Sequence, residues 1–184
     1  MIKGKIDRNG LPLLLNEKNL TGTGAEIGVW FGQFSDWILA NSQLSCLFSI
    51  DPWEAYDTGR LNGQTITQEQ QDEAYQTTKN LLEKYGDRSQ IIKKTSAETA
   101  KDIADDSLDF IFIDGDHSYD ACKQDLEIWY PKLKSGGIFS GHDFISGKFR
   151  WGTFGVKDAV TEFANKLNVE ITLLKCNSWM FEKP

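Results

Sequence analysis

The sequence predicts an α/β fold with a doubly wound, mostly parallel sheet and an antiparallel hairpin near its C-terminus. Short apolar runs alternate along the chain with segments of helical spacing. One of these runs, 108–113, is continuous and mostly apolar, as in a strand that is covered on both faces. Two further runs, 169–175 and 179–182, are separated only by Cys176-Asn177-Ser178, which is short enough for a hairpin.

The composition indicates one soluble domain, 1–184, because a domain takes roughly 150 residues. The chain has 20 Lys+Arg against 27 Asp+Glu, a net charge of −7, and no basic block, which argues against a nucleic-acid partner. No stretch approaches the ~18 apolar residues of a membrane span, so no membrane partner is expected. Three scattered cysteines without a CxxC pair favour a reducing compartment, and we expect a cytoplasmic location.

The first half of the chain alternates strands with helices. Residues 1–24 are interpreted as a short N-terminal helix, 11–16, followed by a flexible glycine-containing segment. A strand at 25–29 runs into a glycine turn, and a helix then begins with Ser35 as its N-cap. The strand at 47–51 ends at Pro52, which cannot continue a ladder. The polar segment 54–70 has no clear period and is predicted to be a mobile loop.

The second half repeats the alternation. Helical spacing from Ala74 to Tyr85 is followed by Gly86 as a stop signal. The remaining elements are expected as a strand at 89–94, a short helix through Ile103, the strand at 108–113, a helix at about 119–133, a turn at 134–137, a strand at 138–141, a loop at 146–155, a helix at 156–167 and the terminal hairpin.

Polar residues gather where the five parallel strands end. In doubly wound sheets, ligands bind beyond the carboxyl ends of the strands, near the topological switch point. Both histidines of the chain are in this set. The five ends are Glu26-Ile27-Gly28, Asp51, Ser96-Ala97-Glu98, Asp114-Gly115-Asp116-His117 and His142-Asp143.

The first two ends predict a nucleoside cofactor. Gly28 allows close approach of a ligand to the backbone, and Gly32 lets the next helix start near the strand, although a glycine pair is also ordinary loop geometry. Asp51 follows Gly28 by 51 − 28 = 23 residues, near the ~20 expected for a carboxylate that binds a ribose diol. The alternative for Asp51 is a turn residue before proline. Glu26, in place of a first glycine, would repel a pyrophosphate but suit an ammonium group, as in S-adenosylmethionine.

The chain lacks the fingerprints of phosphate-containing cofactors. There is no G-x-G-x-x-G after the first strand and no G-x-x-x-x-G-K-[ST] loop. An NAD(P)-binding Rossmann-like oxidoreductase therefore remains only as an alternative function, and a nucleoside-triphosphate site is not expected.

These motifs resemble those of class I S-adenosylmethionine-dependent methyltransferases. The residues that carry the resemblance are Glu26-x-Gly28-x-x-x-Gly32, Asp51, Asp114-Gly115-Asp116-His117-Ser118-Tyr119 and Gly136-Gly137-x-x-x-Gly141-His142-Asp143. Within the class they are most similar to the small bacterial group related to macrocin-type O-methyltransferases. The similarity spans Ala25 to Phe144 and implies a Rossmann-like methyltransferase sheet.

The resemblance implies a set of cofactor-binding residues. The Gly28 turn would hold the methionine part, with Glu26 near its ammonium, and Asp51 would bind the ribose hydroxyls. Trp53 would pack beside the adenine, or else be an ordinary core aromatic. Ser96 and Ala97 would border the adenine. The set is completed by Gly32, in the glycine turn, and by Asp114.

Acceptor activation is expected at the fourth and fifth strand ends. Metal-dependent O-methyltransferases usually place an acid at the fourth end and two acidic or amide ligands at the fifth, whereas this chain offers His142-Asp143. If a divalent metal binds, Asp114, His142 and Asp143 are the expected ligands, and Asp116 or His117 takes the proton. If none binds, a histidine is the expected general base. Asp116 and His117 could instead cap the following helix.

The acceptor site is expected from two loops, 54–70 and 144–155, and from a partner subunit if the protein is a homodimer. The aromatic segment Phe149–Gly155 would form a lid over a planar or sugar-like acceptor, or else an apolar loop tucked onto the sheet edge. The sequence thus predicts a methyltransferase that acts on a hydroxyl of a small molecule. A module that binds the cofactor without catalysis is a further alternative.

Overall fold

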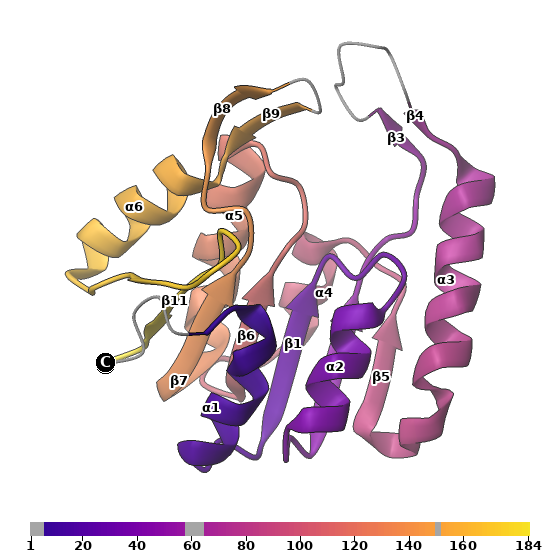
Figure 1. The fold of residues 1–184 in the computed structure, drawn as a ribbon, viewed down its shortest axis with the longest axis horizontal. Coiled ribbons are helices and arrows are strands. Elements are labelled where there is room, and N and C mark those ends of the chain that lie inside the picture. The colour runs from indigo at the N-terminus through magenta and orange to yellow at the C-terminus, as the bar shows by residue number, and fades with distance from the viewer. Residues whose placement is uncertain (1–5, 58–64, 150–151) are drawn as a thin grey trace.

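A seven-stranded sheet forms the centre of the computed structural model, which describes residues 6–57, 65–149 and 152–184 (Figure 1). The strand order is β10-β11-β7-β6-β1-β2-β5, and β11 alone runs antiparallel to its neighbours. The sequence-based fold class is confirmed. The strands are β1 Thr23–Ile27, β2 Cys46–Ile50, β5 Ser89–Ile92, β6 Leu108–Ile113, β7 Leu133–Gly141, β10 Thr172–Leu173 and β11 Trp179–Glu182.

Six α-helices in the described residues cover the two faces of the sheet, each over its own apolar core. One core joins α1, α2 and α3 to sheet residues such as Phe110 and Phe112, and the other joins α4, α5 and α6 to residues such as Ile111 and Phe139. This alternation of inward faces along β6 and β7 explains why their sequences are almost uniformly apolar. The helices are α1 Leu11–Glu17, α2 Gln33–Asn41, α3 Gln68–Leu82, α4 Ser96–Asp102, α5 Tyr119–Trp129 and α6 Val156–Leu167.

The topological switch point lies at β1. From β1 the chain proceeds to β2 and β5 on one side, and to β6 and β7 on the other. Because connections leave in opposite directions there, the loops after β1 and β6 diverge and leave room for a ligand at the carboxyl ends. None of the described helices combines the length and the apolar character needed to cross a membrane.

Several predicted boundaries are wrong for local reasons. The second helix begins at Gln33 with Gly32 as its N-cap, because Gly32 has a φ of +77° and turns the chain earlier than expected. Ser35, the predicted N-cap, is therefore inside α2. The fifth helix ends at Trp129, since Pro131 belongs to a following 3-10 turn, Tyr130–Lys132. The predicted turn 134–137 lies inside β7.

Both predicted acceptor loops contain a short hairpin. In the first, β3 (Tyr56–Asp57) pairs with β4 (Thr65–Ile66), and α3 then begins six residues before the predicted Ala74. In the second, β8 (Ser146–Phe149) pairs with β9 (Gly152–Gly155). The two hairpins project beyond the carboxyl ends of the sheet (Figure 1). Residues 58–64 of the first loop and 150–151 of the predicted lid lie outside the described residues, so the mobility of both loops stays a prediction.

Candidate active site

The Gly28 turn brings the ends of three strands together. Its amide donates to Ile50 O at the end of β2, 2.9 Å away, and its φ is +87°. A Cβ at this position would lie 2.2 Å from the Asp114 carbonyl oxygen at the end of β6. Only glycine fits such a contact, so the turn forms a backbone cradle at the switch point.

Asp51 stabilises this turn directly. Its Oδ2 accepts the amides of Val29 and Trp30, at 2.9 and 3.0 Å, and its Oδ1 accepts the amide of Trp53 at 2.8 Å. A carboxylate has about four acceptor positions, so Oδ1 keeps one for a ligand hydroxyl. Asp51 therefore stabilises the turn and still has an acceptor position that a ligand could use. These are the two roles that the sequence left open.

Glu26 is buried beneath the cradle. Its carboxylate accepts a short hydrogen bond from Ser35 Oγ, which lies 2.8 Å from Ser49 Oγ. Burial raises the pKa of Glu26 to about 8, and the bond from Ser35 opposes that shift. The two serines were missed as site residues, because helical and strand periodicity show which residues are buried but not which ones meet.

Trp53 and Gly32 support the turn from behind. The Trp53 indole is fully buried, lies 4.9 Å from the Tyr75 ring and donates from Nε1 to Trp30 O at 2.8 Å. The structure thus favours the core alternative for Trp53. Gly32 is buried against Thr78 of α3, to which a Cβ would approach within 3.0 Å. We infer that both residues position the cradle rather than line it.

Ser96 is held by two partners that the sequence did not indicate. Its hydroxyl donates to Asp125 Oδ1 and accepts from Trp129 Nε1 at 2.8 Å. Burial raises the pKa of Asp125 to about 6, and the bond from Ser96 opposes the shift. Ala97 follows Ser96 in the first turn of α4 and is half-buried. This network fixes the edge expected to border the adenine.

A cluster of two histidines and two carboxylates lies at the ends of β6 and β7. His117 Nε2 is 3.0 Å from Asp143 Oδ2 and 3.5 Å from Asp114 Oδ1. His142 Nδ1 is 3.2 Å from Asp143 Oδ1 and 3.9 Å from Asp114 Oδ1. Asp143 has a φ of +48°, an uncommon conformation outside glycine that turns its carboxylate between the two imidazoles.

The charges of this cluster are strongly coupled. Burial lowers the pKa of His117, but hydrogen bonds to Asp114 and Asp143 outweigh that effect and raise it to about 9. Burial raises the pKa of Asp143, but hydrogen bonds from His117 and His142 hold it well below its usual range. Without a metal, His117 is therefore a cation at neutral pH, paired with two carboxylates.

The donor atoms that could hold a metal differ from the predicted set. Asp114, His117 and Asp143 each offer one ligand atom, and these atoms lie within 4.8 Å of one another. The sequence instead predicted Asp114, His142 and Asp143. Mixed nitrogen and oxygen donors fit zinc or a first-row transition metal better than magnesium, which prefers oxygen. A bound cation would replace the proton on His117.

Asp116 lies outside the cluster. It is exposed, and its Oδ1 accepts the amide of Ser118 at 2.8 Å, just before α5. Asp116 thus supports the turn that leads into α5, whose N-cap is Ser118, and no described contact joins Asp116 to either histidine. His117 is covered instead by Phe154 of β9, with ring centroids 4.9 Å apart. Gly155 N donates to His117 O at 2.8 Å, so the β8–β9 hairpin is anchored to the cluster.

Arg8 reaches the site from the N-terminal segment, where the sequence predicted only a helix and a flexible stretch. Its Nη1 lies 3.1 Å from Asp114 Oδ2, on the side of that carboxylate away from His117. The two residues are 106 positions apart. No local pattern could indicate a contact of this range.

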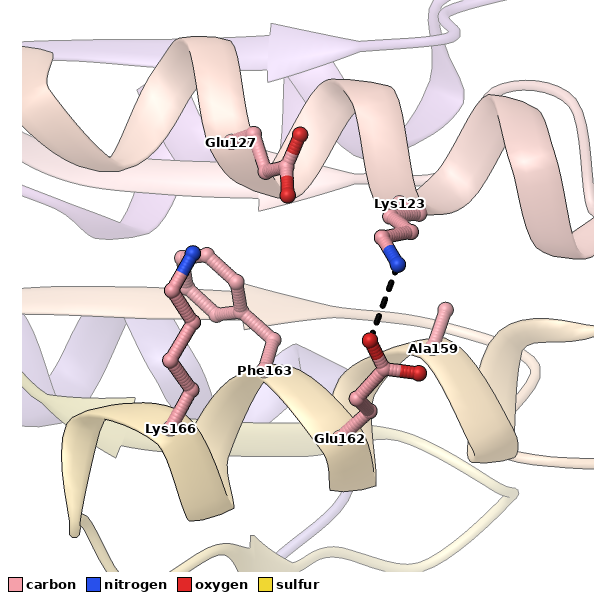
Figure 2. Close-up of a pocket in the computed structure, with 6 residues that line it drawn as sticks. All are labelled: Lys123, Glu127, Ala159, Glu162, Phe163 and Lys166. Atoms are coloured by element: carbon pink, nitrogen blue, oxygen red, sulfur yellow. Dashed lines mark hydrogen bonds and ion pairs between the residues drawn. The ribbon is translucent and has the colours of Figure 1, made fainter.

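A separate crevice between α5 and α6 is not part of this site (Figure 2). It has a volume of about 90 Å³, and the Lys123–Glu162 ion pair crosses it at 2.8 Å. Binding pockets for small molecules have volumes of about 300–1,000 Å³, so this crevice is too small for a nucleoside.

Comparisons with known proteins point to one family. Residues 25–144, more than half of the chain, match a family described as a methyltransferase domain. An uncharacterised protein of Sinorhizobium fredii, y4gI, is 26% identical over 129 residues, which are 70% of this chain. The chain spans only 13% of the length of that relative.

Two solved structures share the fold. A putative caffeoyl-CoA O-methyltransferase from Staphylococcus aureus is 19% identical with a TM-score of 0.67, covering 95% of this chain and 82% of its own. The O-methyltransferase TomG from Streptomyces achromogenes, solved in complex with SAM, is 13% identical with a TM-score of 0.63, covering 96% and 79%. Identities this low show a common architecture and leave the substrates open.

Proposed function

This chain belongs to the methyltransferase-domain family, and from that premise we propose that it transfers a methyl group from S-adenosylmethionine to a hydroxyl of a small molecule. The observation that carries the proposal is the convergence of Gly28, Asp51 and Asp114 at the switch point of the sheet. S-adenosylmethionine supplies an activated methyl group on a sulfonium.

The cradle fits the cofactor in three respects. The absent Cβ of Gly28 leaves room for the methionine part, and Asp51 Oδ1 offers a free acceptor position to a ribose hydroxyl. Glu26 is a buried carboxyl beneath the turn, and a bound ammonium would favour its ionised form. The proteins that share the fold support the same ligand, since TomG was solved with SAM. The site contains no phosphate-binding loop.

The histidine cluster fits the activation of an acceptor oxygen in either of two ways. If a divalent metal binds, Asp114, His117 and Asp143 would hold it, and it would supply Lewis acidity that lowers the pKa of the acceptor hydroxyl. If none binds, His142 takes the proton, because His117 already carries one at neutral pH, and Asp143 orients the ring. In both schemes, Asp143 is the group that both histidines share.

The two hairpins are the proposed walls of the acceptor site. Phe154 places an aromatic face beside His117, which suits a planar or sugar-like acceptor. A second copy of the chain would complete the walls if the protein is a homodimer. A cytoplasmic location, and the absence of nucleic-acid or membrane partners, remain predictions from the composition.

Ligand binding and methyl transfer test the proposal together. We expect S-adenosylmethionine and S-adenosylhomocysteine to raise the melting temperature and NAD to leave it unchanged. Metabolite profiling with an isotope-labelled methyl donor should then reveal a labelled, hydroxylated product. Stabilisation by NAD alone would favour an oxidoreductase, and cofactor binding without transfer to any acceptor would favour a non-catalytic module.

Chelation separates the two activation schemes once an acceptor is known. Removal of divalent metals should abolish turnover if a metal activates the hydroxyl, with recovery on adding zinc, cobalt or manganese. Turnover that survives chelation would assign the proton transfer to a histidine.

A further inference from the structure

The segment that carries Arg8 is fixed to the body of the protein on both sides. The indole Nε1 of Trp37, on α2, donates to Asn9 O at 2.8 Å. On the other side, Lys175 N donates to Ile6 O at 2.9 Å. Asp7 closes the turn by accepting the amide of Asn9 at 2.9 Å. The Arg8 side chain thus leaves from a defined position at the edge of the cradle.

The guanidinium is held at one end and open at the other. Its Cζ lies 5.0 Å from the centroid of the Phe34 ring, and its Nη1 is 3.1 Å from Asp114 Oδ2. Its other N–H groups have no hydrogen-bond partner among the residues that the structure describes. The side chain is 36% exposed, so these donors remain accessible to a ligand.

The surroundings of this cation are otherwise acidic. Asp114 contacts Arg8 directly, and buried Glu26 experiences the charges of Arg8, Asp114 and Asp51. Within the described ranges, no other lysine or arginine forms an ion pair with an acid at the carboxyl ends of β1, β2, β6 or β7. The other cation of this region, His117, is paired with Asp114 and Asp143, so Arg8 is the cation with donors left for an anionic group near Gly28 among the described residues.

We propose that Arg8 binds the α-carboxylate at the amino-acid end of the cofactor. The amino-acid end is a zwitterion, with an ammonium and a carboxylate on one carbon. A site for it therefore requires an anionic and a cationic side chain next to each other. Asp114 provides the anionic side for the ammonium, and a bound ammonium would favour the ionised form of Glu26 as well. Arg8 provides the cationic side, 3.1 Å from Asp114. A guanidinium forms paired, charge-assisted hydrogen bonds with a carboxylate, which a lysine cannot reproduce. This inference rests on the proposed cofactor.

Two ligands that differ by one carboxylate give a direct test. Calorimetry would compare S-adenosylmethionine with its decarboxylated analogue, in the wild type, Arg8→Gln and Arg8→Lys. We expect Arg8→Gln to weaken binding of S-adenosylmethionine about 10- to 100-fold, as for the loss of charge-assisted hydrogen bonds. Binding of the decarboxylated analogue should change less than about threefold. Arg8→Lys should fall between the two for S-adenosylmethionine.

The control is Lys18→Gln, which removes a positive charge from a pair with Glu182 at the opposite, amino end of the sheet. It should leave both affinities unchanged. If Arg8→Gln and Arg8→Lys weaken both ligands equally, or neither, Arg8 only holds the fold and the inference is overturned while the cofactor stands. If the wild type binds neither ligand, the proposed cofactor fails and this inference fails with it.

Discussion

The strand ends on the two sides of the switch point are built differently. On the β1–β2 side, backbone groups dominate: the Gly28 amide bonds to β2, and Asp51 accepts three backbone amides. On the β6–β7 side, four ionisable side chains face one another with distances of 3.0 to 3.9 Å. The β1–β2 side is therefore a rigid backbone surface, which we call the rigid side. The β6–β7 side is a group of interacting charged side chains, which we call the charged side.

This difference indicates a division of labour. A cofactor that is the same in every turnover can be bound by a fixed backbone surface at little entropic cost. Proton transfer or metal binding requires groups whose charge can change, and such groups keep some access to solvent. We therefore expect substitutions on the first side to alter affinity and stability, and those on the second side to alter turnover.

Replacing either histidine should produce the largest effect. His117→Ala and His142→Ala should each lower methyl transfer about 10²- to 10⁴-fold, the range for loss of a general acid–base group. Cofactor affinity should change less, about threefold, because each imidazole reaches the proposed cofactor site only through Asp114, at 3.5 and 3.9 Å. Label transfer and calorimetry would measure the two quantities.

Asp116→Asn is the matched control for the histidines. Its carboxylate is exposed and bonds only to Ser118 N among the described residues, so turnover should stay within about threefold of the wild type. A loss as large as that of the histidine variants would restore the catalytic role that the sequence suggested for Asp116.

Gly28→Ala should damage the rigid side most. The new Cβ would lie 2.2 Å from Asp114 O, at a φ of +87°, so both strain and overlap oppose folding. We expect a loss of about 2–5 kcal/mol in unfolding free energy, together with loss of cofactor binding. Denaturant unfolding measures the first effect.

Gly86→Ala isolates the backbone contribution to that loss. Gly86 also has a positive φ, +53°, but a Cβ there would meet no atom within 4 Å. With a ψ of −131°, Gly86 lies in a sparsely populated region, and Gly86→Ala should cost about 1–3 kcal/mol from backbone strain alone. Equal losses in the two variants would mean that the contact between Gly28 and Asp114 is unimportant.

Asp51→Ala should weaken cofactor binding about tenfold or more, corresponding to ~1.5–3 kcal/mol for hydrogen bonds to a charged group. The variant loses the proposed acceptor for a ribose hydroxyl and also the partner of three turn amides. Asp72→Ala, which removes an exposed carboxylate 3.7 Å from Lys93, is the control. Unchanged affinity in Asp51→Ala by calorimetry would refute the assignment of Asp51.

Asp125 should give a smaller, pH-dependent effect. Its folded pKa of about 6 exceeds the ordinary 3.8, so between these values the folded protein holds a proton that the unfolded chain has released. The unfolding free energy should therefore fall as pH rises from 3.8 to 6, on the order of 2 kcal/mol. Asp125→Asn should not show this fall. If the unfolding free energies of the wild type and Asp125→Asn change in parallel with pH, the raised pKa of Asp125 is refuted.

The sequence indicates the geometry of the β1–β2 side more directly than that of the β6–β7 side. Gly28 and Asp51 are recognisable because a turn of this shape requires a glycine and an acid at a set spacing. Arg8 was missed because its contact spans 106 positions, and the Asp125 partner of Ser96 because helical spacing does not specify which buried side chains meet. The choice between His117 and His142 depends on the positive φ of Asp143, which no spacing shows.

The position of β11 between β7 and β10 has a consequence for the order of folding. Strands β1, β2, β5 and β6 are complete by residue 113, whereas β7 gains its second neighbour only when residues 179–182 pair with it. Until then β7 is an edge strand, which exposes unpaired backbone groups. Because distant pairings form slowly and domains fold as the chain emerges, we expect the half that contains Gly28 to consolidate first and the half that contains His142 last.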